Sequence, residues 1–276
     1  MTRPAFRLGP ALLFCPADRP DRFEKALARA DAVILDLEDA VAEDRKAAAR
    51  DALFAHPLDP ERVIVRVNPA ASAHRAADLE ALAGTAYRVV MLAKCEGTAD
   101  LVDLEDYEVI PLCETARGVL AAPDLAALPN VAALMWGAED LVASLGGASS
   151  RHADGRYRDP AVHARASVLL AAAAHGAAAI DAVHLDLDDD AGLRDEAADA
   201  AALGFAATAC VHPAQVPVVR AAYRPDDARV EWALAVLARA EGAPGVFAFR
   251  GAMVDGPVLR QAEAIVRLAG AATSDG

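Results

Sequence analysis

Lysine is scarce in this sequence. Only Lys25, Lys46 and Lys94 occur among its 27 basic residues, and the others are arginine. A Schiff-base enzyme needs a lysine at its reacting centre, and Lys94 alone follows a stretch that we predict to be a strand. Schiff-base chemistry therefore has a single candidate residue here.

Cysteine is also rare, and the sequence has no long apolar run. The four cysteines (Cys15, Cys95, Cys113 and Cys210) have no CxxC or zinc-finger spacing. No apolar run approaches the length of a membrane span, and the apolar stretch at 11–15 is too short for a signal peptide. We therefore expect a cytoplasmic protein with reduced thiols and no membrane partner.

Basic residues are fewer than acidic ones in this chain. The chain carries 41 acidic residues, a net charge of −14 and a pI near 4.9, which argues against nucleic acid or an anionic membrane as a partner. Its 276 residues are 55% hydrophobic, which is enough for a real core in one large domain or two small ones.

Short apolar runs alternate with segments of helical composition along most of the chain. Eight such runs are predicted strands, at 11–15, 33–37, 63–67, 88–92, 109–113, 131–136, 182–185 and 208–211. Gly176 and Gly204 stand where helices should end. Eight strand–helix repeats predict an α/β protein with a (β/α)8 TIM barrel. An open doubly wound sheet is the alternative, but no GxGxxG follows the first strand.

The pattern changes after the eighth strand. We predict a barrel domain over 1–224 and a C-terminal helical extension over 225–276. The extension must pack on the barrel, cover its mouth as a lid, or reach a neighbouring subunit.

Polar residues gather where the predicted strands end. In a barrel those ends converge on one rim, where the active site of such enzymes lies. The residues are Asp36, Glu38 and Asp39; Arg66 and Asn68; Lys94 and Glu96; Glu114; Glu139 and Asp140; Asp186; and His212.

Glu114 and Asp140 form the most informative pair. They follow two predicted strands joined by a helical segment, so the strands should be parallel and the two carboxylates should face each other. Close carboxylates repel unless a hard divalent cation neutralises them. The alternative is that both are solvated loop acids or helix caps.

Seven short motifs resemble one known family. They are LFCPADR (13–19), ILDLEDAV (34–41), VRVN (65–68), ETARG (114–118), WGAEDL (136–141), VHPAQ (211–215) and MVDGP (253–257). In this order they resemble the citrate lyase β-subunit-like proteins of the HpcH/HpaI aldolase superfamily, which includes malyl-CoA and citramalyl-CoA lyases. The resemblance extends from about residue 10 to residue 268.

The resemblance implies a set of site residues. Glu114 and Asp140 would hold Mg²⁺, with Mn²⁺ as a substitute, and Arg66 would lie beside the thioester carbonyl. Asp255 would be the acid/base residue, delivered by the lid of a neighbouring subunit in a homotrimer or hexamer. Residues that would contact substrate or coenzyme A are Phe14, Arg19, Lys25, Arg66, Glu139 and His212.

The family further implies cleavage of a short β-hydroxyacyl-CoA to an acyl-CoA and an oxo acid through a thioester enolate. Two other functions stay open: a β-type subunit acting on a citryl group held by an acyl carrier protein, and a Schiff-base aldolase using Lys94. Acyl-group preference, stereochemistry and direction are not fixed by the sequence.

Several side chains have a second interpretation. Arg66 could simply pair with the acids at 36–39, and Asp36, Glu38 and Asp39 could support Arg66 or a water on the metal. His212 is equally compatible with a structural role. The loop 146–159, with Arg151, Arg156 and Arg158, could recruit coenzyme phosphates or be a solvated crossing.

Overall fold

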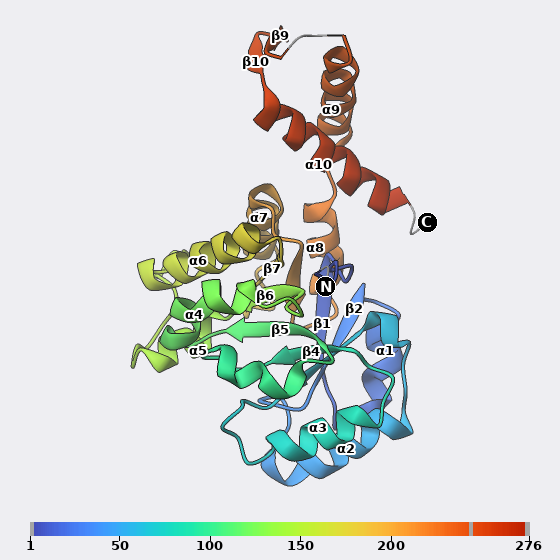
Figure 1. Cartoon of the computed structure of the whole chain (residues 1–276), viewed down its shortest axis with the longest axis vertical. Coiled ribbons are helices and arrows are strands. Elements are labelled where there is room, and N and C mark those ends of the chain that lie inside the picture. The colour runs from blue at the N-terminus through green and yellow to red at the C-terminus, as the bar shows by residue number, and fades with distance from the viewer. Residues whose placement is uncertain (1–2, 243–244, 274–276) are drawn as a thin grey trace. The chain divides into compact units, whose positions relative to one another are not determined.

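Eight parallel strands close into a barrel in the computed structural model, which describes residues 3–242 and 245–273 (Figure 1). The strands pair in chain order, and β8 pairs with β1. They are β1 (Ala11–Pro16), β2 (Ala32–Asp36), β3 (Val63–Val67), β4 (Val89–Leu92), β5 (Glu108–Cys113), β6 (Ala133–Trp136), β7 (Ala178–Asp181) and β8 (Ala207–Cys210). The predicted TIM-barrel fold is confirmed.

The barrel interior is a packed apolar core. Alternate residues of the strands point inward, so each short apolar run supplies one or two side chains to it. The inward residues are at most 3% exposed: Leu12, Ala32, Ile34, Ile64, Met91, Ile110, Leu112, Ala133, Met135, Ile180, Ala207 and Ala209.

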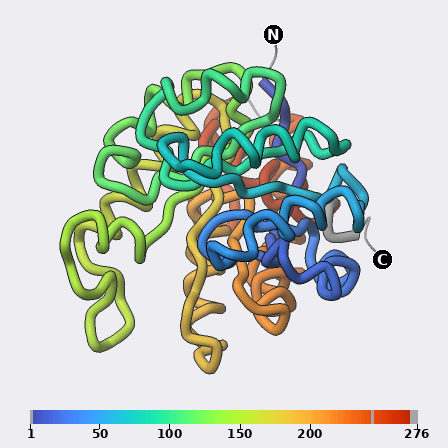
Figure 2. The backbone as a smooth tube through the Cα atoms, turned by 90° about the horizontal axis from the view of Figure 1, so that it is seen from below, coloured from blue at the N-terminus to red at the C-terminus, as the bar shows by residue number. Residues whose placement is uncertain are grey.

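Helices lie around the strands, as the views in Figures 1 and 2 show. The segments between β1 and β3 contain short 3-10 helices, whereas several helices after β3 are long α-helices. The helices of the barrel are η1 (Pro20–Arg22), α1 (Phe23–Leu27), η2 (Glu43–Arg45), α2 (Lys46–Ala55), η3 (Pro60–Arg62), α3 (Arg75–Ala83), η4 (Thr98–Leu104), α4 (Ala116–Ala127), α5 (Ala138–Ser144), α6 (Asp159–His175) and α7 (Asp190–Leu203). Gly176 and Gly204 end α6 and α7 with φ of 70° and 100°, as predicted.

The seventh strand was predicted wrongly. It spans Ala178–Asp181 and not 182–185. The chain turns at Gly176 and enters the sheet at once, where the N–H of Ala178 donates to the carbonyl of Ala132. The alanine-rich strand has little β-propensity of its own, and its neighbours in the barrel decide its place. Residues 182–185 are the loop that follows.

The chain divides into two compact units, residues 1–219 and 220–276. Helix α8 (Gln215–Tyr223) runs across the division. The second unit contains α9 (Asp227–Ala240), a hairpin of β9 (Phe247–Phe249) and β10 (Ala252–Val254), and α10 (Gly256–Thr273). Its own small core is built on Ala233, Val236, Val254 and Ala262.

Within the part of the chain that the structure describes, we find no helix with the length and apolar character that a membrane crossing requires.

Candidate active site

Arg66 and Asp36 form the best-defined ion pair at the rim. They are register partners at the ends of β3 and β2. The Nε and Nη2 atoms of Arg66 donate to the two carboxylate oxygens of Asp36, each over 2.6 Å. The N–H groups of Glu38 and Ala40 donate to the same carboxylate. Asp36 therefore accepts four hydrogen bonds, which suits a group that orients the guanidinium.

The guanidinium of Arg66 is a permanent cation. Arg66 is 9% exposed, and burial opposes its charge, but Asp36, Glu38 and Glu114 outweigh burial and raise its pKa. Its Nη1 lies 3.2 Å from an oxygen of Glu38, and its Cζ lies 4.8 Å from the ring centroid of Phe14. These contacts use three of the five N–H donors of a guanidinium, so two remain for a substrate oxygen.

Lys94 links the acids of the rim. Its Nζ donates to Glu38 and, over 2.8 Å, to Asp39, and it lies 3.4 Å from Asp140. Burial works against the charge of Lys94, but its carboxylate partners, Asp39 first, outweigh burial and raise its pKa. A lysine that stays protonated is a poor nucleophile, which is unfavourable for a Schiff base at Lys94.

Glu114 and Asp140 come together as predicted. Glu114 directly follows β5 and is 3% exposed, whereas Asp140 lies in the first turn of α5 with its side chain 38% exposed. Burial, and then the negative charge of Asp140, raise the pKa of Glu114 to about 8. Arg66 and Lys94 lower the pKa of Glu114, but burial and the charge of Asp140 outweigh them.

This donor set fits a hard divalent cation. Carboxylate oxygens are the ligands such ions prefer, and a pair of them leaves positions for water and substrate. Within the described residues, no group of three or more histidine, cysteine, aspartate or glutamate side chains is arranged to hold a metal. Glu114 and Asp140 are the pair of side chains that could hold such a cation at the rim.

Two glycines allow Glu114 to reach this position. A Cβ on Gly137 would lie 2.9 Å from an oxygen of Glu114, and one on Gly118 would lie 2.3 Å from the carbonyl oxygen of Cys95. The N–H of Gly118 also donates to the hydroxyl of Thr115, which caps α4. The close approach of β5, α4 and α5 around Glu114 thus depends on small residues.

Three other predicted residues lie apart from this cluster. Arg19 pairs with Asp21 over 3.0 Å on the surface, and Lys25 is exposed on α1. Glu139, next to Asp140, accepts a hydrogen bond of 2.6 Å from the hydroxyl of Ser150. The structure therefore brings Phe14, Arg66, Glu114 and Asp140 together but leaves these three outside.

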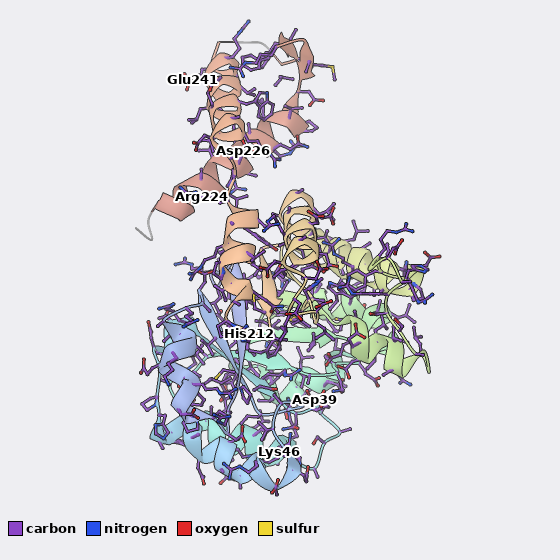
Figure 3. All side chains as sticks on the ribbon, turned by 180° about the vertical axis from the view of Figure 1, so that it is seen from behind. Asp39, Lys46, His212, Arg224, Asp226 and Glu241 are labelled. Atoms are coloured by element: carbon purple, nitrogen blue, oxygen red, sulfur yellow. The ribbon has the colours of Figure 1, made fainter. Side chains whose placement is uncertain are left out.

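His212 and Asp255 have local contacts only. His212, labelled in Figure 3, is exposed on the loop after β8. Its Nδ1 accepts from the N–H of Ala214. Asp255 belongs to the second unit, where its carboxylate accepts from the N–H of Val258 at the start of α10. Their roles in catalysis stay predictions.

A cavity of about 960 Å³ opens beside the rim. Its walls come from the loop 146–158, from α6 and α7, and from the loop after β7, and Glu139 belongs to them. Arg151 and Arg156 pair there with Glu196 and Asp154. These arginines are engaged within the chain, which favours the structural interpretation of the loop. In Figure 2 the loop 146–158 (yellow-green) and the loop after β7 (yellow) extend away from the barrel.

Sequence reasoning missed two polar residues that fix this region. Asp181 ends β7 and accepts from Trp136 Nε1 over 2.6 Å and from Arg165. Gln215 donates to the carbonyl of His184 and accepts from the N–H of His212. Asp181 was missed because the strand was misplaced. Gln215 belongs to the VHPAQ motif, but the motif did not indicate that its side chain joins the loops after β7 and β8.

The comparison with family models gives a match over residues 11–213 to "HpcH/HpaI aldolase/citrate lyase". The match spans the whole barrel, from β1 to the loop after β8. The chain belongs to this family. Membership makes the protein a carbon–carbon lyase, and the family resemblance of the seven motifs is confirmed.

Other members of the HpcH/HpaI family match over most of their length. A citrate lyase subunit beta-like protein of Mycobacterium tuberculosis is 58% identical over 267 residues, 97% of this chain and 98% of that protein. The mitochondrial citramalyl-CoA lyase of Mus musculus is 31% identical over 94% of this chain and 85% of its own. The crystal structure of CitE from Mycobacterium tuberculosis with magnesium, acetoacetate and coenzyme A has a TM-score of 0.92 at 58% identity, covering 95% of this chain and 98% of that one.

Proposed function

We propose that this protein is a Mg²⁺-dependent lyase that cleaves a short β-hydroxyacyl-CoA of the malyl-, citramalyl- or hydroxymethylglutaryl-CoA type. The products would be an acyl-CoA such as acetyl-CoA and an oxo acid, and condensation would use the same groups in reverse. The observation that carries the proposal is the oriented guanidinium of Arg66 beside the carboxylate pair of Glu114 and Asp140.

Arg66 would stabilise the charge that develops on the thioester oxygen. Breaking the bond between the hydroxyl-bearing carbon and the carbon next to the thioester leaves an enolate. Asp36 and Glu38 hold the guanidinium before substrate arrives, so little reorganisation is needed when the charge appears. A donor oriented in this way is often worth about 3–4 kcal/mol in the transition state.

Glu114 and Asp140 would hold the divalent cation. The relative from Mycobacterium tuberculosis was crystallised with magnesium and coenzyme A, and the carboxylate pair offers the oxygen ligands that Mg²⁺ needs. When bound, such an ion supplies Lewis acidity and orients the hydroxyl and carboxylate of the departing oxo acid.

A further acid must protonate the enolate carbon. We assign this step to Asp255 of a neighbouring copy in a homotrimer or hexamer, with the C-terminal unit as a lid, because the MVDGP motif carries that role in the family. Phe14, Arg19, Lys25 and His212 would contact the coenzyme, and Glu139 the substrate. The free thiols of the four cysteines suit a reducing compartment such as the cytoplasm.

A β-type subunit that acts on a carrier-bound citryl group is the second candidate. It is favoured by the relative described as citrate lyase subunit beta-like. Purified protein that cleaves free coenzyme A thioesters unaided would make a carrier protein unnecessary.

The deciding experiment is a screen of β-hydroxyacyl-CoA thioesters with purified protein and Mg²⁺, measuring free oxo acid and acyl-CoA. Glu114→Gln and Asp140→Asn should each abolish Mg²⁺-dependent turnover while the fold survives. Glu105→Gln, at an exposed acid, serves as the control. Unchanged turnover in the first two variants would contradict the assignment of the metal ligands.

A further inference from the structure

Lys94 contacts four acids at the rim, among them both members of the pair Glu114 and Asp140. Its ammonium reaches Glu38, Asp39 and Asp140, and its backbone N–H donates to Oε1 of Glu114 over 2.9 Å. The proposed Mg²⁺-dependent cleavage does not use Lys94. Its side chain is 28% exposed, so an ion in solution can approach the same carboxylates.

The backbone at Lys94 is arranged to make these contacts. Its φ is 48°, in the left-handed region that non-glycine residues seldom adopt. This turn follows β4 and aims the N–H at Glu114 while the side chain runs back across the rim. A residue held in this region, whose backbone and side chain both contact carboxylates of the rim, points to a role for those contacts.

The contacts of Lys94 also reach Arg66. Glu38 gives one oxygen to Lys94 Nζ and the other to Arg66 Nη1. Lys94 therefore stands between the cationic group that would face the thioester and the carboxylate pair that would hold the metal. Its ammonium offsets the negative charge of Asp140 over 3.4 Å.

We propose that Lys94 is a positioning residue whose ammonium is a built-in counter-cation, which competes with the divalent ion for Asp140 and holds Glu38 against Arg66. This inference rests on the proposed function, because it takes Glu114 and Asp140 as the metal ligands. An ammonium and a divalent ion repel each other at such distances. The charge of Lys94 thus lowers metal affinity while it keeps the cluster of acids stable without metal.

The test is Mg²⁺ binding by titration calorimetry on the full chain. Lys94→Met should bind Mg²⁺ at least about fivefold more tightly than the wild type, since one charge this close to a divalent ion changes affinity by about tenfold. The metal-free variant should also melt at a lower temperature and gain more in Tm from saturating Mg²⁺. Its kcat should fall, because Glu38 loses a partner.

Matched variants separate this role from a structural one. Lys94→Arg keeps the charge and should stay within about threefold of the wild-type Kd, and Arg194→Met removes an exposed charge on α7 and should not change it. If Lys94→Met does not fold, Lys94→Gly, which relieves the backbone strain, must show the same tightening.

The outcomes distinguish the two proposals. Unchanged or weaker Mg²⁺ binding in a neutral Lys94 variant, with the wild type binding normally, overturns the role of Lys94 alone. A wild type that binds no Mg²⁺, even at millimolar concentrations, overturns the metal site of the proposed function and this inference with it.

Discussion

Glu114 is a buried carboxyl group beside a second acid, Asp140. Burial, and then Asp140, raise its pKa from 4.5 to about 8. The folded chain therefore binds a proton at Glu114 more tightly than the unfolded chain. The stability from this proton is fully present below pH 4.5 and is lost as the pH rises through about 8.

We expect Glu114→Gln to flatten this dependence. In the absence of divalent ions, the Tm of the wild type should fall between pH 4.5 and about 8, and that of the variant should fall less, because glutamine does not ionise. Thermal melts across this range, with Glu105→Gln as control, measure the difference. Parallel curves for all three proteins would contradict a raised pKa at Glu114.

Arg66→Lys should reduce kcat far more than it changes the fold. Lysine keeps the charge but loses the two-pronged bond to Asp36, so the group that would stabilise the enolate is no longer oriented. The expected loss is about 100- to 1,000-fold in kcat. Steady-state kinetics measure it, with Arg194→Lys as control; a kcat within a few-fold of the wild type would argue against Arg66 at the reacting centre.

Single residues were predictable where their position along a strand determined their direction. Asp36, Arg66 and Glu114 stand at strand ends, and parallel strands bring such ends to one rim. The contacts of Lys94 were not predictable, since they depend on a left-handed turn that nothing in Ala93-Lys94-Cys95 indicates. The sequence shows that residue 66 is a cationic arginine. It does not show how many of the N–H donors of that guanidinium are already hydrogen-bonded within the chain.

At the scale of elements, the turn from β5 into α4 controls the site. Gly118 lies where the first turn of α4 passes the carbonyl of Cys95, and Thr115 caps the same turn. The close packing of α4 on the loop after β4 keeps Glu114, at the start of this turn, at the rim. A larger side chain at Gly118 must push α4 away from the loop after β4.

Gly118→Ala should therefore destabilise the protein by about 1–3 kcal/mol. Its Cβ would lie 2.3 Å from the carbonyl oxygen of Cys95, whereas a Cβ on Gly97 would meet no atom within 4 Å. Denaturant unfolding of the two alanine variants compares the sites directly. Equal stability of Gly118→Ala and Gly97→Ala would show that α4 moves without cost.

The predicted strands overlap the observed ones except at β7. The core supplies the context that makes this alanine-rich segment a strand, because Ile180 is buried in the barrel core and Ala178 packs against it. Val183 and Leu185 looked more strand-like in the sequence, yet Leu185 is 54% exposed. The connection after α6 is short, so the strand begins at Ala178, before the residues with the higher β-propensity.

At the scale of the whole molecule, the residues proposed for catalysis lie in two different compact units of the chain. Asp255 lies in the unit of residues 220–276 and the acid pair in that of residues 1–219. In the proposed mechanism, the acid pair of one copy works with Asp255 of another copy. A chain with an inactive barrel and a chain with an inactive lid should therefore complement each other.

Mixing Glu114→Gln with Asp255→Ala under conditions that allow subunit exchange should restore activity. With random assembly, about a quarter of the sites would pair an intact barrel with an intact lid. Turnover is measured before and after exchange, with each variant alone as the baseline. Absence of recovery, despite exchange shown by mass spectrometry, would place Asp255 outside a shared site.

The buried thiols have a practical consequence. All four cysteines lie in the described part of the chain and are buried, and burial raises the pKa of Cys15 to about 11 and that of Cys95 to about 12. Such thiols react slowly with maleimides. A fluorophore attached through Ala248→Cys on the exposed β9–β10 hairpin would therefore report its motions against a nearly silent background, without the need to engineer a cysteine-free parent.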